Sequence, residues 1–150
     1  MFQKIYDKSR DKNIIVYLPD DYYVTEERYP VLYMNDGQNA FFDDQAYIGV
    51  SWGMEDYLKK SNLKVIVVAI PCVFSEYGRA SEYGPWDVLS GTLMRDDSHE
   101  LIKGTGEEYC QWLIHDLKPY IDRRFRTLKD NTAMTGSSSG GIITAYACMK

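Results

Sequence analysis

A short segment around residue 138 combines the residue types and the spacing of a nucleophilic serine. Gly136, Ser138 and Gly140 form the pattern G-x-S-x-G, which follows a strand-like run at 132–135 and precedes a helical pattern at 142–150. Glycines two residues before and after the serine let a strand turn abruptly into a helix and expose the hydroxyl. The first N–H groups of such a helix can stabilise a developing oxyanion. The alternative interpretation is a glycine- and serine-rich turn that binds an anion.

The two histidines of the chain precede Ser138 and are poorly placed to act as its base. His115 falls on the polar side of a predicted helix, which predicts an exposed residue. His99 stands in an acidic loop at 95–100, and no second histidine lies at the spacing of a metal ligand. We therefore predict no metal and no cofactor. None of the residues after Ser138 is His, Asp or Glu.

The strands and helices that would position this serine alternate along the chain. Residues 3–6 and 13–18 flank a polar turn and predict an antiparallel hairpin. The runs 31–34 and 65–70 are apolar, and the second has the composition of a strand buried on both faces. With the short strand at 132–135 and the helices between them, these patterns predict an α/β protein with a largely parallel sheet.

Two segments between the strands have helical patterns, and a third segment has none. Ser51 is predicted to cap a helix that runs to about Lys60. After Gly106, apolar residues recur at helical spacing, at Cys110, Leu113, Ile114, Leu117 and Ile121. Pro119 lies within that pattern and predicts a kink or a shortened helix. The intervening segment 71–105 is predicted to be a long irregular loop, and such loops are commonly functional or disordered.

Composition excludes several classes of function. The chain has 150 residues, 45% of them hydrophobic and 26% charged, which is typical of one globular domain. Its net charge of −5 argues against a nucleic-acid partner. The longest apolar run is much too short to span a membrane, and residues 1–7 lack the apolar core of a signal peptide. The three widely spaced cysteines, Cys72, Cys110 and Cys148, predict reduced, mostly packed thiols in a cytoplasmic protein.

Several stretches of the sequence resemble the putative-esterase family of α/β-hydrolases, which includes enterochelin esterases, feruloyl esterases and S-formylglutathione hydrolases. The stretches are VYLP at 16–19, YPVLYMNDGQN at 29–39, EYGPW at 82–86, LKPYIDRRFRT at 117–127 and GSSSGG at 136–141. They span almost the whole chain in the order that the family has. The resemblance implies an α/β-hydrolase fold, with a mostly parallel sheet and an N-terminal antiparallel hairpin. Asn35 stands where family members commonly have His, at a position that shapes a loop.

The resemblance also implies roles for individual residues. Ser138 would be the catalytic nucleophile, and the backbone N–H of Ser139 would be one donor of the oxyanion hole. The second donor would come from the loop after the 31–34 strand, where the matching position is Gln38. The Asp36-Gly37 pair that precedes Gln38 is also typical of a tight turn that closes a strand, and the two interpretations are compatible.

The EYGPW stretch lies in the long segment after the 65–70 strand, where α/β sheets place their ligands. Tyr83 and Trp86 are candidates for stacking on an aromatic or sugar group, and Arg79 is a candidate for pairing with a carboxylate or with Glu82. An equally supported interpretation is that Trp86 packs the loop against the domain.

The family's triad runs Ser, then Asp or Glu, then His along the chain, so the acid and the histidine are expected beyond residue 150. Residues 1–150 are thus expected to be the N-terminal part of a single α/β-hydrolase domain, truncated after the helix that follows Ser138. The leading interpretation is a serine carboxylic-ester hydrolase that forms an acyl-enzyme on Ser138 and is inactive in this fragment. Its partner would be a small-molecule ester, such as an aryl or sugar ester, and the fragment would self-associate. The alternatives are an acyltransferase of the same fold and a non-catalytic binding module.

Overall fold

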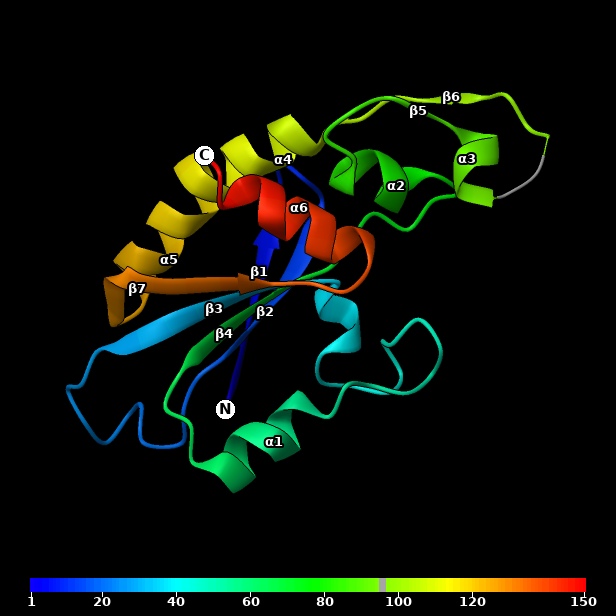
Figure 1. Ribbon diagram of the computed structural model, residues 1–150. Coiled ribbons are helices and arrows are strands. Elements are labelled where there is room, and N and C mark those ends of the chain that lie inside the picture. Colours follow the sequence, from blue (N-terminus) through cyan, green and yellow to red (C-terminus); the bar gives the residue numbers. More distant parts are fainter. Residues whose placement is uncertain (95–96) are drawn as a thin grey trace. The chain divides into compact units, whose positions relative to one another are not determined.

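The computed structural model describes residues 1–94 and 97–150, and these residues form two compact units. Unit 1 comprises Met1–Pro71 and Ile121–Thr135, and unit 2 comprises Cys72–Tyr120 and Gly136–Lys150. Unit 1 contains the large sheet, and unit 2 contains most of the helices (Figure 1).

The sheet of unit 1 is mixed and has the strand order β1-β2-β4-β3-β7. Its strands are β1 (Phe2–Asp7), β2 (Lys12–Tyr17), β3 (Tyr29–Asn35), β4 (Ile66–Ile70) and β7 (Thr127–Thr135). The β1-β2 hairpin is antiparallel, as predicted, and β2 is also antiparallel to β4. The remaining two pairs, β3-β4 and β3-β7, are parallel. These parallel pairs confirm the α/β class, and the N-terminal hairpin supplies the antiparallel part.

The centre of the sheet is formed by β4, whose five residues are all buried. One face of the sheet, with Tyr17 and Val67 among its residues, packs against Phe41 and against Leu58 of helix α1 (Met54–Ser61). The rings of Phe2 and Phe41 meet edge-on with centroids 5.0 Å apart. A strand buried on both faces needs apolar side chains at successive positions, which explains the unbroken apolar run of β4.

The strand β7 is longer than the predicted run at 132–135. Tyr29 pairs with Thr127 and Val31 pairs with Thr132, so a bulge separates the two parts of the β3-β7 ladder. Six of the nine β7 residues are exposed, and the first part has a polar sequence without the pattern of a strand. Pairing with β3, and not local hydrophobic periodicity, therefore extends this strand.

The predicted cap of helix α1 is wrong. The residue before its first turn is Gly53, in a left-handed conformation with φ 64°, and the N–H of Ser51 donates instead to Asp43 Oδ1 at 2.8 Å. Leu58 is the buried residue of the helix, and Trp52 just before it is exposed. At the start of this helix the N–H of Met54 donates to the backbone carbonyl of Ala40 at 3.1 Å, in place of a side-chain cap.

The predicted helix after Gly106 is continuous through Pro119. It consists of α4 (Gly106–Trp112), a π-helical turn (Leu113–Leu117) and α5 (Lys118–Arg124). In the π turn the N–H of Lys118 donates to the carbonyl of Leu113, five residues back. Proline lacks an N–H and its ring crowds the carbonyl four residues earlier, and a widened turn relieves both problems. The predicted apolar positions Cys110, Leu113, Leu117 and Ile121 are buried.

The segment 71–105 is more regular than predicted. It contains α2 (Gly78–Tyr83), β5 (Val88–Leu89), α3 (Ser90–Met94) and β6 (Leu101–Ile102). Strands β5 and β6 form a two-stranded antiparallel sheet. Elements of two to six residues are too short to show hydrophobic periodicity, which explains why the sequence indicated an irregular loop.

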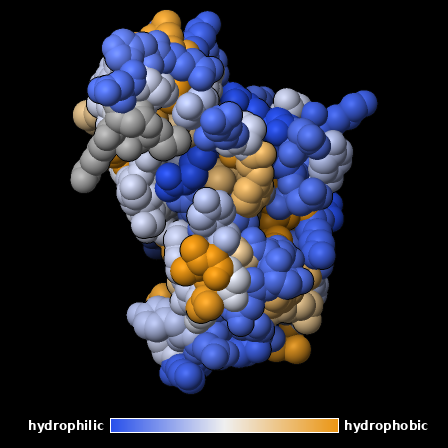
Figure 2. All heavy atoms as spheres, turned by 90° about the vertical axis from the view of Figure 1, so that its right-hand side faces the viewer, coloured by the Kyte–Doolittle hydropathy of each residue, from blue (hydrophilic) through white to orange (hydrophobic). Residues whose placement is uncertain are grey.

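On the face shown in Figure 2, hydrophilic residues predominate and apolar residues stand among them. In unit 1 the loop after β3 exposes Tyr47, Ile48 and Val50. No helix in residues 1–94 and 97–150 is long and apolar enough to cross a membrane. The three cysteines are free, as predicted, and two of them are buried. Burial raises the pKa of the Cys110 thiol to about 11, so this thiol stays protonated.

Candidate active site

The backbone of Ser138 has the strained conformation that the G-x-S-x-G pattern predicts. Its φ of 54° and ψ of −121° lie outside the regions that an L-residue ordinarily occupies. Such a conformation costs about 1–3 kcal/mol and persists only where surrounding contacts impose it. Ser138 is exposed and directly precedes helix α6 (Ser139–Ala147). The chain therefore presents the serine hydroxyl at the surface at the start of a helix.

Backbone hydrogen bonds hold the peptides on both sides of Ser138. The carbonyl of Ser137 accepts from the N–H of Gly140 at 2.8 Å. The carbonyl of Ser138 accepts from the N–H groups of Gly141 at 2.9 Å and Ile142 at 3.1 Å. The first turn of α6 thus closes directly around the serine. We name residues 136–141 the elbow.

Gly136 and Gly140 are in contact in the elbow. A Cβ on Gly136 would lie 2.3 Å from the carbonyl oxygen of Gly140 and 2.4 Å from its carbonyl carbon. No side chain fits at that distance, because the clash is with backbone atoms. This close approach is the physical reason for the first glycine of the pattern.

The predicted oxyanion donors belong to different units. In unit 2, Ser139 is the first residue of α6, and the first N–H groups of a helix have no carbonyl partner within that helix. In unit 1, Gln38 lies in the short 3-10 helix η1 (Gly37–Asn39) that follows β3. Asp36 adopts φ 55°, and Gly37 passes so close to β4 that a Cβ would lie 2.2 Å from the Ile70 nitrogen. The loop that carries Gln38 is therefore held tightly against the end of the sheet.

Arg79, predicted as a substrate contact, lies against the elbow. Its Nη2 donates to the carbonyl oxygen of Ser137 at 3.0 Å. Its guanidinium carbon also lies 5.4 Å from the centre of the Tyr83 ring, one turn further along α2. The guanidinium group thus joins α2 to the residue that precedes the candidate nucleophile.

Tyr83 and Trp86 have different surroundings. Tyr83 is only 1% exposed, and its ring meets that of Tyr109 edge-on at 5.5 Å. In this arrangement Tyr83 is a packing residue, with no ring face open to a ligand. Trp86 is 69% exposed, and its ring meets that of Tyr146 on α6 edge-on at 6.0 Å. Trp86 thus packs against helix α6 through one edge-on contact and leaves most of its surface exposed.

The buried Glu82 has a structural contact. Its Oε2 accepts from the N–H of Val73 at 3.2 Å, which ties α2 to the segment after β4. This contact accounts for a buried carboxylate beside Tyr83, since a buried charge requires a hydrogen-bond donor.

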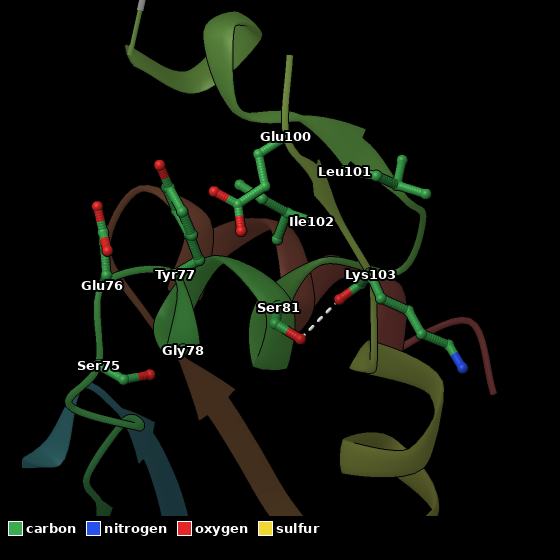
Figure 3. Close-up of a pocket in the computed structure, with 9 residues that line it drawn as sticks. All are labelled: Ser75, Glu76, Tyr77, Gly78, Ser81, Glu100, Leu101, Ile102 and Lys103. Carbon is green, nitrogen blue, oxygen red and sulfur yellow. Dashed lines mark hydrogen bonds between the residues drawn. The ribbon is translucent and has the colours of Figure 1, made fainter. Parts of the chain in front are cut away.

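A recess in unit 2 was not predicted from the sequence. It has a volume of about 440 Å³ and lies between the start of α2 and strand β6 (Figure 3). Two carboxylates and several hydroxyl groups contribute to its lining, which consists of Ser75, Glu76, Tyr77, Gly78, Ser81, Glu100, Leu101, Ile102 and Lys103. The Ser81 hydroxyl donates to the Lys103 carbonyl at 2.6 Å and closes its base. These residues have no characteristic spacing in the sequence, so only the fold could reveal the recess.

The histidines do not form a metal site with the described carboxylates. His115 is exposed on the π turn, as predicted, and His99 is exposed with Nδ1 in contact with the carbonyl of Asp97. Arg95 and Asp96 of the acidic loop lie outside the described residues. Within 1–94 and 97–150, no group of three or more His, Cys, Asp or Glu side chains is arranged to hold a metal ion.

A network of charged and polar groups joins the elbow helix to α4. Glu107 accepts hydrogen bonds from the Tyr146 hydroxyl at 2.7 Å and from Gln111 Nε2 at 2.8 Å, and it pairs with Lys150 Nζ at 2.7 Å. The ammonium group of Lys150 and these donors lower the pKa of the Glu107 carboxyl to about 2. Glu107 therefore remains charged at any pH near neutrality.

Comparisons with known proteins show to which family and fold the chain is similar. The profile of a family described as "Putative esterase" matches residues 8–150. The uncharacterized protein YbbA of Bacillus subtilis (strain 168) is 23% identical over 146 residues, which are 95% of this chain and 53% of YbbA.

Solved structures share the fold. An IroE-like serine hydrolase from Shewanella oneidensis matches with a TM-score of 0.73 and 22% identity, over 98% of this chain and 45% of its own. The siderophore hydrolase EstA from Aspergillus nidulans matches with a TM-score of 0.65 and 13% identity, over 100% and 52%. A ferulic acid esterase from Anaeromyces mucronatus matches with a TM-score of 0.58 and 22% identity, over 98% and 52%. The chain thus has an α/β-hydrolase fold and spans about half the length of these relatives.

Proposed function

Because this chain belongs to the putative-esterase family, we propose that the protein containing it is a serine carboxylic-ester hydrolase with Ser138 as nucleophile. The observation that carries the proposal is the backbone of Ser138, with φ 54° and ψ −121° at the start of α6. An exposed serine held in this strained turn is the arrangement that presents a hydroxyl to a substrate carbonyl.

In the proposed reaction a histidine removes the Ser138 proton, and the hydroxyl oxygen attacks the ester carbonyl carbon. The tetrahedral intermediate collapses to an acyl-enzyme and releases the alcohol, which takes its proton from the histidinium. Water then attacks the acyl carbon, the histidine accepts its proton, and the acid leaves as Ser138 is reprotonated. Since no His, Asp or Glu follows Ser138 up to residue 150, we place the histidine and its acid in the further length that the relatives have.

The backbone N–H groups of Ser139 and Gln38 are proposed to bind the oxyanion of the intermediate. Support for Ser139 comes from its place at the first position of α6, where the helix dipole favours negative charge. Support for Gln38 comes from the loop after β3, which the close contact of Gly37 with β4 holds in one conformation. Donors fixed in advance stabilise the developing charge without reorganisation.

The proposed substrate is a small-molecule ester with an aryl or sugar group. The exposed Trp86 ring supports this proposal, because such a ring can stack on an aromatic or sugar face. A ferulic acid esterase and siderophore hydrolases stand among the proteins of the same fold. The three free thiols support a cytoplasmic location for the protein.

The test uses the full-length protein and a fluorophosphonate probe. We expect covalent labelling of Ser138, identified by peptide mass spectrometry, together with hydrolysis of p-nitrophenyl acetate. Ser138→Ala is expected to lose both, whereas Ser9→Ala, which removes an exposed hydroxyl in the hairpin turn of unit 1, is expected to retain both. Labelling that persists in Ser138→Ala would refute the assignment.

The same assay separates the alternative functions. An acyltransferase would use the same serine but would give an acylated alcohol when a sugar is added. A binding module would give neither labelling nor turnover in the full-length protein. Product analysis in the presence and absence of the added sugar therefore decides between hydrolysis and transfer.

A further inference from the structure

We infer that Arg79 is a positioning residue for the nucleophile: its guanidinium group holds the Ser137–Ser138 peptide in the orientation that the strained Ser138 requires. The inference rests on the proposed function of Ser138 and adds a residue that acts through the elbow backbone. It replaces the sequence-based role of Arg79 as a ligand for a substrate carboxylate.

The orientation of the Ser137 carbonyl group determines the φ angle of Ser138. Rotation about φ of Ser138 turns the preceding peptide group relative to the serine, so a fixed Ser137 carbonyl also fixes that angle. Two donors reach this oxygen, the N–H of Gly140 at 2.8 Å and Arg79 Nη2 at 3.0 Å. A carbonyl oxygen has two lone pairs, and here each has a donor. The Gly140 bond is internal to the elbow, whereas Arg79 ties the elbow to another element.

Arg79 is itself held in place by buried aromatic rings. Its guanidinium group lies over the ring of Tyr83, which is 1% exposed and packs edge-on against Tyr109, a fully buried residue of α4. A planar guanidinium can stack on a ring and donate in its own plane at the same time. The buried pair Tyr83 and Tyr109 thus supports a donor that is directed at the elbow.

This arrangement explains why Tyr83 is buried although its neighbour Trp86 is exposed. The ring of Tyr83 supports the guanidinium group of Arg79, which donates to the elbow, whereas Trp86 is exposed to solvent. It also gives a chemical reason for arginine at position 79. A lysine could donate to the Ser137 carbonyl, but it lacks the planar group that stacks on Tyr83.

The experiment compares Arg79→Met and Arg79→Lys with Arg123→Met in the full-length protein, using a neutral ester, an ester with a carboxylate in its acyl chain, and the fluorophosphonate probe. Arg123 is an exposed arginine on α5 and serves as the matched control. We expect Arg79→Met to lower kcat for both esters and the labelling rate of Ser138 by about tenfold to a hundredfold, with KM little changed, as for a displaced reacting group. Arg79→Lys is expected to recover part of the loss, and Arg123→Met to resemble the wild type.

A second measurement is independent of activity. Hydrogen exchange at the amides of Gly140 and Gly141 is expected to be faster in Arg79→Met than in the wild type or in Arg123→Met, because the Ser137 carbonyl loses the donor that ties the elbow to α2. A rise in KM confined to the carboxylate ester, with unchanged exchange, would overturn the inference in favour of a substrate contact. If the wild type showed no Ser138-dependent turnover, the proposed function would fail, and the exchange rates would still decide whether Arg79 holds the elbow.

Discussion

At the scale of single residues, the proposed nucleophile is a serine whose backbone conformation its neighbours must impose. Ser138 has φ 54°, and the contact between Gly136 and Gly140 lets the chain turn that sharply. A serine in an ordinary loop would relax to a negative φ. The proposed chemistry thus depends on the glycines of the elbow as much as on the serine.

Gly136→Ala is expected to damage the elbow directly. Its Cβ would lie 2.3 Å from the Gly140 carbonyl oxygen, and the backbone would have to move to admit it. We expect a loss of about 1–3 kcal/mol in the free energy of unfolding, the range of overpacked sites, and a strong loss of Ser138 labelling. Thermal unfolding and probe labelling of the full-length variant check both expectations.

Gly141→Ala is the matched control for this prediction. A Cβ there would lie 3.3 Å from the Gly136 carbonyl oxygen, a tight contact that a small shift relieves. It is expected to reduce stability and labelling much less. Equal effects of the two substitutions would show that the packing of Gly136 against Gly140 is not what shapes the turn.

At the scale of elements, the elbow helix α6 is attached to α4 by a charged side chain. Glu107 of α4 accepts from the Tyr146 hydroxyl of α6 and pairs with Lys150, which follows that helix. The same Tyr146 ring carries the edge-on contact with Trp86. The carboxylate therefore links α4 to the helix that begins after the proposed nucleophile, and through Tyr146 to the exposed Trp86.

Glu107→Gln is expected to lower Tm slightly at neutral pH, since exposed ion pairs contribute little. The pKa of Glu107 falls from 4.5 to about 2 on folding, so the unfolded state binds the proton more readily. The stabilisation is present above about pH 4.5 and is lost as the pH falls towards 2. The difference in Tm between wild type and variant should shrink over that interval.

Asp116→Asn, at an exposed site on the same helical run, is the control for this titration. It is expected to leave the wild-type pH profile in place. A difference between wild type and Glu107→Gln that stays constant from pH 7 to pH 2 would contradict the proposed link between α4 and α6.

At the scale of the whole molecule, the sheet of unit 1 has an open side. Strand β7 is last in the order β1-β2-β4-β3-β7, and within residues 1–94 and 97–150 it pairs with β3 alone. Six of its nine residues are exposed. An edge strand of this length presents unpaired N–H and C=O groups to other chains.

Residues 1–150 expressed alone are therefore expected to self-associate and to hydrolyse p-nitrophenyl acetate only at the background rate. The first expectation follows from the β7 edge, and the second follows from the lack of a general base after Ser138, since an unassisted serine hydroxyl is a weak nucleophile. Light scattering coupled to size exclusion, and an esterase assay with Ser138→Ala as control, measure them. A monomeric chain with Ser138-dependent turnover would refute this prediction and would point to His99 or His115 as the base.

The sequence by itself determined the features that depend on neighbours along the chain. The β1-β2 hairpin, the buried strand β4 and the apolar face of the helix after Gly106 follow from periodicity, which reports the side of an element that is buried. The elbow is also local, because the turn and the glycines that allow it lie within six residues. These features were predictable for that reason.

Only the tertiary structure decided what depends on partners far away in the sequence. The first part of β7 is a strand because β3 pairs with it, and the recess beside α2 forms because β6 returns to that helix. Arg79 and Ser137 are 58 positions apart, and no pattern in the sequence indicates that one donates to the other. Contacts at such separations depend on the packing of whole elements, whereas periodicity reports only which side of each element is apolar.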